Sequence, residues 1–168
     1  MFVLQGVTRL KKCGSQTHLL RPPHVVARRV ADKPRLRGLR GLPQSVKEAL
    51  EAIPAAAHPM DVMRSGVSAL GCVLPEVHDH NAADARDTAD RLLASLGSIL
   101  LYWYHFAHHG RRIEVETDDD SIGGHFLHLL HGRAPSASWV RAMHVSLILY
   151  AEHEFNASTF TARVIAGT

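Results

Sequence analysis

The long stretch from Ala85 to His108 constrains the fold more than any other part of the sequence. Apolar residues recur along it at three- and four-residue spacing, as they do on one face of an α-helix. Its second half, Ile99-Leu100-Leu101-Tyr102-Trp103-Tyr104, is apolar nearly all round. A helix without a polar face has to be buried, either inside a large core or across a subunit interface. Gly110 is expected to end it.

Shorter helical patterns lie on both sides of this stretch, and no convincing strand pattern accompanies them. Further helices are expected over residues 36–54 with a break at Pro43, 61–75 with an N-cap near Asp61, 122–132 behind an acidic cap at 117–121, 139–152, and from 156 onward. The predicted fold class is therefore all-α, a multihelical bundle of about six helices from residue 36 onward.

Charge divides the chain into two parts. Residues 1–40 hold ten Lys or Arg and one acid, Asp32, and so carry +9, whereas the other residues carry −6. Three interpretations of the basic part stay open: an arm or tail outside the fold, an organelle transit peptide, or a misread frame joined to a genuine domain. None of them packs into the core. We divide the chain into a basic segment, residues 1–34, disordered or misread, and a helical domain, residues 35–168, and we expect no nucleic-acid partner.

Cysteine content and hydropathy indicate the compartment. Cys13 and Cys72 are too few for a disulfide framework and are interpreted as free thiols in a reducing, cytoplasmic setting. Cys72 follows Gly71 in an apolar helix and is expected in the core. No apolar run reaches the length of a membrane span, so no membrane partner is expected.

Thirteen histidines raise the question of a metal site. His125, His128 and His131 recur every third residue, so their side chains fan out around a helix and do not converge on one ion. Surface or half-buried structural histidines are the preferred interpretation, and no metal site is predicted. Asp118-Asp119-Asp120 is interpreted as a cap on the following helix dipole.

The corner after the 139–152 helix is the candidate binding site. His153 ends an apolar helix, and Asn156 and Ser158 follow within one turn. Ring nitrogens, an amide, a hydroxyl and the free N–H groups of a helix start suit a carboxylate or a keto acid. A capped corner with a hydrogen-bonded histidine is the alternative, and the residues alone do not decide between the two.

Several segments resemble the large helical domain of the citrate synthase family, and most closely its 2-methylcitrate synthase branch. They are Leu39-Arg40-Gly41-Leu42-Pro43, HPMDVMRSGVSALG at 58–71, LLASLGSILLYWYH at 92–105, ETDDDSIGGHFLHLLHG at 116–132 and AEHEFNASTFTARVIAGT at 151–168. The resemblance covers residues 35–168. It implies condensation of propionyl-CoA or acetyl-CoA with oxaloacetate, without a cofactor because the CoA thioester is a substrate.

The resemblance also implies residue roles. His153 and Asn156 would bind oxaloacetate, and Ser158 would orient the histidine that stabilises the enol. The helices at 59–71 and 85–108 would form a homodimer interface. The catalytic histidines and aspartate of the family are expected beyond Thr168, so no catalytic residue is assigned here and the chain is interpreted as a fragment that is inactive alone. A non-catalytic module that dimerises with a full-length synthase, and a metal-binding helical protein, are the alternatives. The sequence does not separate acetyl-CoA from propionyl-CoA.

Overall fold

The computed structural model describes residues 34–74 and 82–151, together with Thr161 and Ile165. Five helices carry the fold: α2 (Gln44–Glu51), α3 (Pro59–Val73), α4 (Ala82–His109), α5 (Ile122–His131) and α6 (Ala137–Ala151). A short helical segment over residues 34–38 precedes them, and the described residues contain no strand. The prediction of an all-α chain is confirmed. Cys13, residues 1–33 of the predicted basic segment 1–34, and the helix expected from 156 lie outside the part of the chain described in full.

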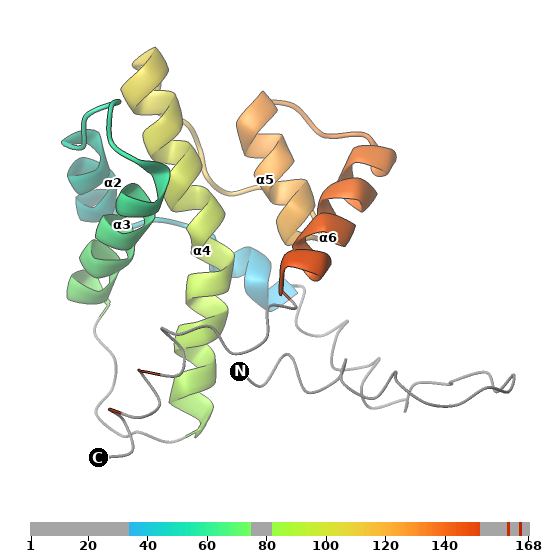
Figure 1. Cartoon of the computed structure of the whole chain (residues 1–168), viewed down its shortest axis with the longest axis horizontal. Helices are drawn as coiled ribbons and strands as arrows, with labels where there is room; N and C mark the ends of the chain where they lie inside the picture. The colour runs from blue at the N-terminus through green and yellow to red at the C-terminus, as the bar shows by residue number, and fades with distance from the viewer. Residues whose placement is uncertain (1–33, 75–81, 152–160, 162–164, 166–168) are drawn as a thin grey trace, which may run out of the picture.

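Helix α4 is the central element (Figure 1). Helices α2 and α3 pack against one side of it and α5 packs against the other. Helix α6 contacts α5 and none of α2, α3 and α4 within the described residues. The order across the molecule therefore runs from the α2–α3 pair, through α4, to the α5–α6 pair.

The apolar half of α4 is buried by the chain's own elements. Ile99, Leu101, Tyr102 and Trp103 are each no more than 2% exposed. The neighbouring helices supply the rest of this core, with Val46 and Leu50 from α2, and Val62 and Leu70 from α3. Of the two explanations that the sequence allowed for this helix, burial in a core accounts for it, and a second copy is not needed to cover these residues.

Polar contacts fix α2 against α4 and the segment that follows it. The hydroxyl of Tyr102 donates to Oε1 of Glu51 at 2.7 Å, and Arg112 donates to both carboxylate oxygens at 2.7 Å each. These bonds lower the pKa of Glu51 to about 2. The hydrogen bond from Arg112 has the larger effect and the one from Tyr102 the smaller. The indole N–H of Trp103 donates to the carbonyl of Ile53 at 3.1 Å. The end of α2 is thereby held at a fixed place on α4.

Several helix boundaries match the sequence pattern and one cap does not. Gly110 and Gly132 both have φ +64° directly after α4 and α5, as predicted for helix-ending glycines. The cap predicted near Asp61 is wrong: α3 begins earlier, and Nδ1 of His58 accepts from the N–H of Met60. Pro59, at the first helical position, has no N–H to satisfy, so the chain can turn into the helix there.

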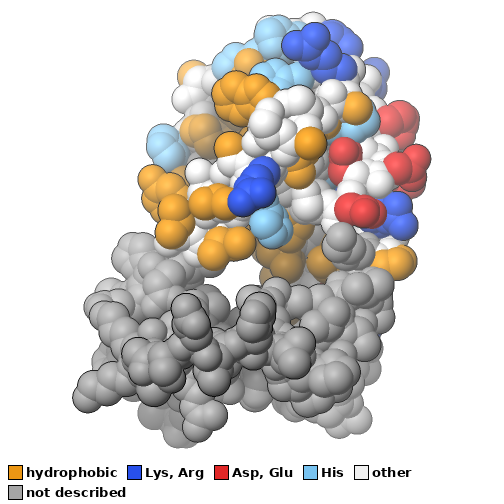
Figure 2. Space-filling model, turned by 90° about the vertical axis from the view of Figure 1, so that its right-hand side faces the viewer, with side chains coloured by type: hydrophobic (Ala, Val, Ile, Leu, Met, Phe, Trp, Pro, Cys, Tyr) orange, Lys and Arg blue, Asp and Glu red, His pale blue; other side chains and the backbone are white. Residues whose placement is uncertain are grey.

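Exposed apolar side chains gather on α6. Trp139, Val145, Ile148, Leu149 and Tyr150 are all exposed, Tyr150 to 83%. Figure 2 views the molecule from the side on which α5 and α6 lie, and hydrophobic side chains are spread over this face. Within the described residues, no helix combines the length and the apolar character needed to cross a membrane.

One prediction about the core is wrong. Cys72 is exposed and is a free thiol, although its neighbours in the sequence are apolar. It lies two positions after the buried Leu70, and that spacing turns it to the solvent side of α3.

Candidate functional site

The binding residues predicted from the sequence lie beyond the last described position of α6. His153, Asn156 and Ser158 all belong to residues 152–160, outside the described part of the chain. Helix α6 ends at Ala151, directly before them. Their roles therefore stay predictions, and the site geometry given below comes from other residues.

Arg40 anchors a polar network between α4, α5 and the segment 110–121. Its side chain is only 2% exposed. Nη1 donates to the carbonyl of Thr117 at 2.6 Å and Nη2 donates to the carbonyl of Asp119 at 2.7 Å. Arg40 is the last basic residue of the charge-rich stretch 1–40 and belongs to the predicted helical domain from residue 35, in which the structure buries it.

Thr117 and His125 continue the network into the core. The hydroxyl of Thr117 donates its single proton to Oδ2 of Asp119 at 2.6 Å, so its oxygen is left to accept from Nδ1 of His125 at 3.0 Å. Nε2 of His125 must then accept from the hydroxyl of Ser98 at 3.1 Å. His125 is thus a neutral imidazole with both nitrogens bonded, held between α4 and the segment before α5.

The charges of this network follow from its burial. Desolvation, reinforced by the nearby Arg40, lowers the pKa of His125 to about 4. Burial also lowers the pKa of Arg40, against the opposing effect of Asp119. For Asp119 burial acts to raise the pKa, but the hydrogen bonds from Thr117 and His128 outweigh it and leave that pKa below its ordinary value. At neutral pH the network therefore holds one guanidinium, one carboxylate and a neutral His125.

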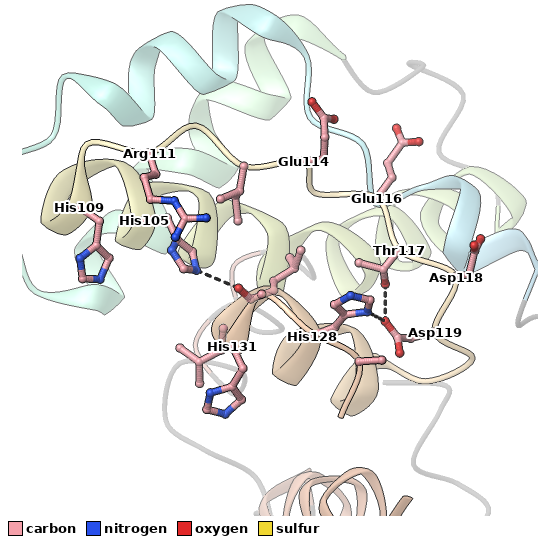
Figure 3. Close-up of a pocket in the computed structure, with 15 residues that line it drawn as sticks. His105, His109, Arg111, Glu114, Glu116, Thr117, Asp118, Asp119, His128 and His131 are labelled. Atoms are coloured by element: carbon pink, nitrogen blue, oxygen red, sulfur yellow. Dashed lines mark hydrogen bonds and ion pairs between the residues drawn. The ribbon is translucent and has the colours of Figure 1, made fainter. Parts of the chain in front are cut away.

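A polar cavity of about 840 Å³ lies beside this network (Figure 3). It is lined by the end of α4, the segment 111–119 and the last turns of α5. One end holds His105, His109, Arg111 and His131, and the other holds Thr117, Asp119 and His128. Nδ1 of His128 donates to Oδ2 of Asp119 at 2.8 Å. The cavity can supply both hydrogen-bond donors and acceptors to a small polar molecule.

The three histidines of α5 lie in three different environments. His125 is 1% exposed inside the core, His128 is half-buried against Asp119, and His131 is exposed. They fan out, as the spacing predicted, but the expectation of surface or half-buried histidines is wrong for His125 and for His105, which is 7% exposed. Within the described residues, no group of three His, Cys, Asp or Glu side chains is arranged to hold a metal ion.

This network was not predicted from the sequence. Arg40 and Asp119 each lie in a run of like charges, where solvent exposure is the usual expectation. The sequence signals nearby are Gly41, next to Arg40, and Ser121, two residues after Asp119. A Cβ at Gly41 would lie 2.6 Å from Oε1 of Glu116, and the Ser121 hydroxyl caps α5 by accepting from the N–H of Gly124. The cap that had been assigned to the aspartates is thus made by Ser121.

Comparisons with known proteins place the chain in a family. A family model described as "Citrate synthase, C-terminal domain" matches residues 27–168. The chain is 63% identical over 142 residues to a 2-methylcitrate synthase of Shewanella oneidensis, which covers 84% of this chain and 37% of that protein. It is 39% identical over 152 residues to a citrate synthase-related protein of Dictyostelium discoideum, covering 79% of this chain and 36% of that protein. A citrate synthase of Heyndrickxia coagulans is 35% identical to the chain over 127 residues. The match covers 76% of this chain and 34% of that protein.

The chain thus spans little more than a third of the length of these relatives. The family model, by contrast, extends over most of the chain, including α2 to α6 and the residues that follow α6 in the sequence. The chain belongs to the citrate synthase family.

Proposed function

We propose that residues 35–168 form part of the large domain of a 2-methylcitrate synthase-like transferase, which condenses propionyl-CoA or acetyl-CoA with oxaloacetate. The observation that carries this proposal is the 63% identity to a protein named 2-methylcitrate synthase. In this proposal the CoA thioester is a substrate, no cofactor takes part, and the enzyme works in the cytoplasm in propionate catabolism.

The proposed oxaloacetate contacts are His153 and Asn156, and Ser158 orients the histidine that stabilises the enol. The matched region extends through all three residues, which supports the assignment. An imidazole and an amide offer hydrogen bonds to the keto and carboxylate oxygens of oxaloacetate. The apolar helix α6 leads directly into this corner, so its packing on α5 would set where these side chains lie.

A chimeric enzyme tests the proposal. Residues 27–168 would replace the corresponding segment of the Shewanella enzyme, and CoA release from propionyl-CoA and oxaloacetate would be measured. We expect the chimera to be active and His153→Ala to lower kcat/KM for oxaloacetate by about 100-fold or more. His144→Ala, at an exposed position on α6, is the matched control and should leave kcat/KM unchanged. An active chimera that tolerates His153→Ala would refute the assigned role.

The 168 residues alone are proposed to lack synthase turnover. The resemblance implies that the base and the carbonyl-polarising histidine of the family lie outside the matched segment, and such groups are typically worth about 10²–10⁴-fold each. The purified 168-residue chain should release no more CoA than its His153→Ala variant under the same assay. Turnover of the unaltered chain above that control would contradict this part of the proposal.

A second candidate is a helical module that forms a homodimer or pairs with a full-length synthase. The observation that favours it is the exposed apolar side of α6, where Leu149 is 69% and Tyr150 is 83% exposed. Surfaces of this kind are typical of protein interfaces. Light scattering after size-exclusion chromatography should then give twice the monomer mass, and the double variant Leu149→Glu/Tyr150→Glu should give the monomer mass. A monomeric unaltered chain would exclude self-association.

A further inference from the structure

His105 has a buried nitrogen without a hydrogen-bond partner. Its side chain is 7% exposed, and Nε2 lies 2.8 Å from the carbonyl oxygen of Leu129. A carbonyl only accepts hydrogen bonds, so Nε2 must carry the proton, and Nδ1 of the neutral ring is an acceptor. This Nδ1 is buried and has no partner among the described residues. Buried polar atoms are nearly always bonded in folded proteins, so a donor from another molecule is expected here.

Arg111 brings a positive charge to the same end of the cavity. Its side chain is exposed and forms no hydrogen bond or ion pair with another described residue, and it lines the cavity together with His105. Figure 3 shows it pointing toward the imidazole of His105. Because no described residue holds the guanidinium in place, it is free to turn to an incoming carboxylate. Guanidinium groups bind carboxylates through two parallel hydrogen bonds.

The carboxylates that line the cavity do not compete for this end. Glu114 and Glu116 extend from the segment 111–119 away from His128 and His131 (Figure 3). Asp119 accepts from Thr117 and His128, and Asp118 lies at that same end of the cavity, away from His105 (Figure 3). The negative charge is thus bonded or directed elsewhere, and the end near His105 holds the guanidinium of Arg111 and the unpartnered Nδ1 of His105, with His109 and His131 beside them.

We propose that this end of the cavity binds a small hydroxycarboxylate. The carboxylate would accept from Arg111, and the neighbouring hydroxyl would donate to Nδ1 of His105. A carboxylate without a hydroxyl would leave Nδ1 unsatisfied, and a neutral alcohol would leave Arg111 unpaired. The proposal uses neither of the proposed oxaloacetate contacts, His153 and Asn156, and does not depend on their roles.

The experiment is an NMR titration of the ¹⁵N-labelled 168-residue chain, with the imidazole of His105 assigned through its backbone. L-malate and succinate are the probes because they share two carboxylates and differ in one hydroxyl. We expect malate to shift Nδ1 of His105 in a saturable way and succinate to cause a much smaller shift. Equal shifts from both probes, or no saturable shift with malate, would overturn the proposal.

Three variants make the assignment specific. Arg111→Gln removes the charge at an exposed position and should weaken malate binding by about tenfold or more, as for the loss of a charged hydrogen bond. Arg141→Gln makes the same change on exposed α6, outside the cavity, and should have no effect. His153→Ala should also retain binding at His105. Loss of the shift in His153→Ala, or its persistence in Arg111→Gln, would show that malate binds elsewhere.

Discussion

His125 joins three segments through one ring. It belongs to α5, accepts from Ser98 of α4, and donates to Thr117 of the segment between those helices. Thr117 in turn accepts from Arg40 at 3.3 Å, so the residues before α2 are tied to the same point. Each buried polar atom of the ring has a partner, and this is what allows an imidazole to remain in the core.

Replacing His125 tests this role at the residue scale. His125→Phe keeps a planar ring of similar size but removes both nitrogens, leaving the buried Ser98 and Thr117 without those bonds. We expect the free energy of unfolding to fall by about 2 kcal/mol. Urea unfolding followed by circular dichroism measures it. His131→Phe, on the exposed side of the same helix, should change stability by less than about 0.5 kcal/mol. Equal losses in the two variants would refute the structural role.

At the scale of elements, the contact between α3 and α4 depends on a missing side chain. A Cβ at Gly66 would lie 2.4 Å from Cγ2 of Ile99 and 3.2 Å from Cδ2 of Leu50. Ile99 is fully buried, so it has little room to move. Gly71 lies on the same helix, and a Cβ there would meet nothing within 4 Å.

These two glycines should respond in opposite directions to the same substitution. Gly66→Ala is expected to destabilise the chain by about 1–2 kcal/mol, because overpacking against Ile99 outweighs the gain in helix propensity. Gly71→Ala is expected to stabilise it by about 0.5–1 kcal/mol, since only the propensity changes. The difference between their urea midpoints is the measurement. A stabilised Gly66→Ala would mean that α3 does not approach α4 as closely as described.

At the scale of the whole molecule, the neutral His125 makes stability depend on pH. Its pKa is about 4 in the folded chain, against an ordinary value of 6.5. Below pH 6.5 the unfolded chain binds a proton that the folded chain does not, so the stability from this group is fully present above that pH. It is lost as the pH falls to about 4, by up to about 3 kcal/mol.

Urea unfolding at pH 7.5, 6 and 5 measures this dependence. The unaltered chain should lose stability from pH 7.5 to pH 5, and His125→Phe should lose distinctly less over the same range. The Glu51 carboxylate, whose pKa is lowered to about 2, affects stability only at pH values below its ordinary pKa of 4.5. It therefore does not mask the comparison. Identical pH profiles for the two proteins would show that His125 is not held neutral in the fold.

The sequence by itself determined the helices and the family. The spacing of apolar residues located α3 to α6 to within a few residues. The glycines that end α4 and α5 could be predicted because the position after a helix often adopts a left-handed conformation, which favours glycine. Helical periodicity is a local property, so it needs no knowledge of the neighbours. The resemblance of several segments also identified the citrate synthase family, and the match to the family model confirms this identification.

Only the tertiary structure decided which surfaces meet. Gly66 and Gly71 look alike in the sequence, yet one is pressed against Ile99 and the other meets nothing within 4 Å. Arg40 reads as part of a basic run, yet it is buried because carbonyls far along the chain come within reach of its guanidinium. The apolar half of α4 is covered inside the chain, whereas the apolar side of α6 is exposed. Burial and pairing depend on contacts between residues that are distant in the sequence, and the local spacing of apolar residues does not determine which residues make those contacts.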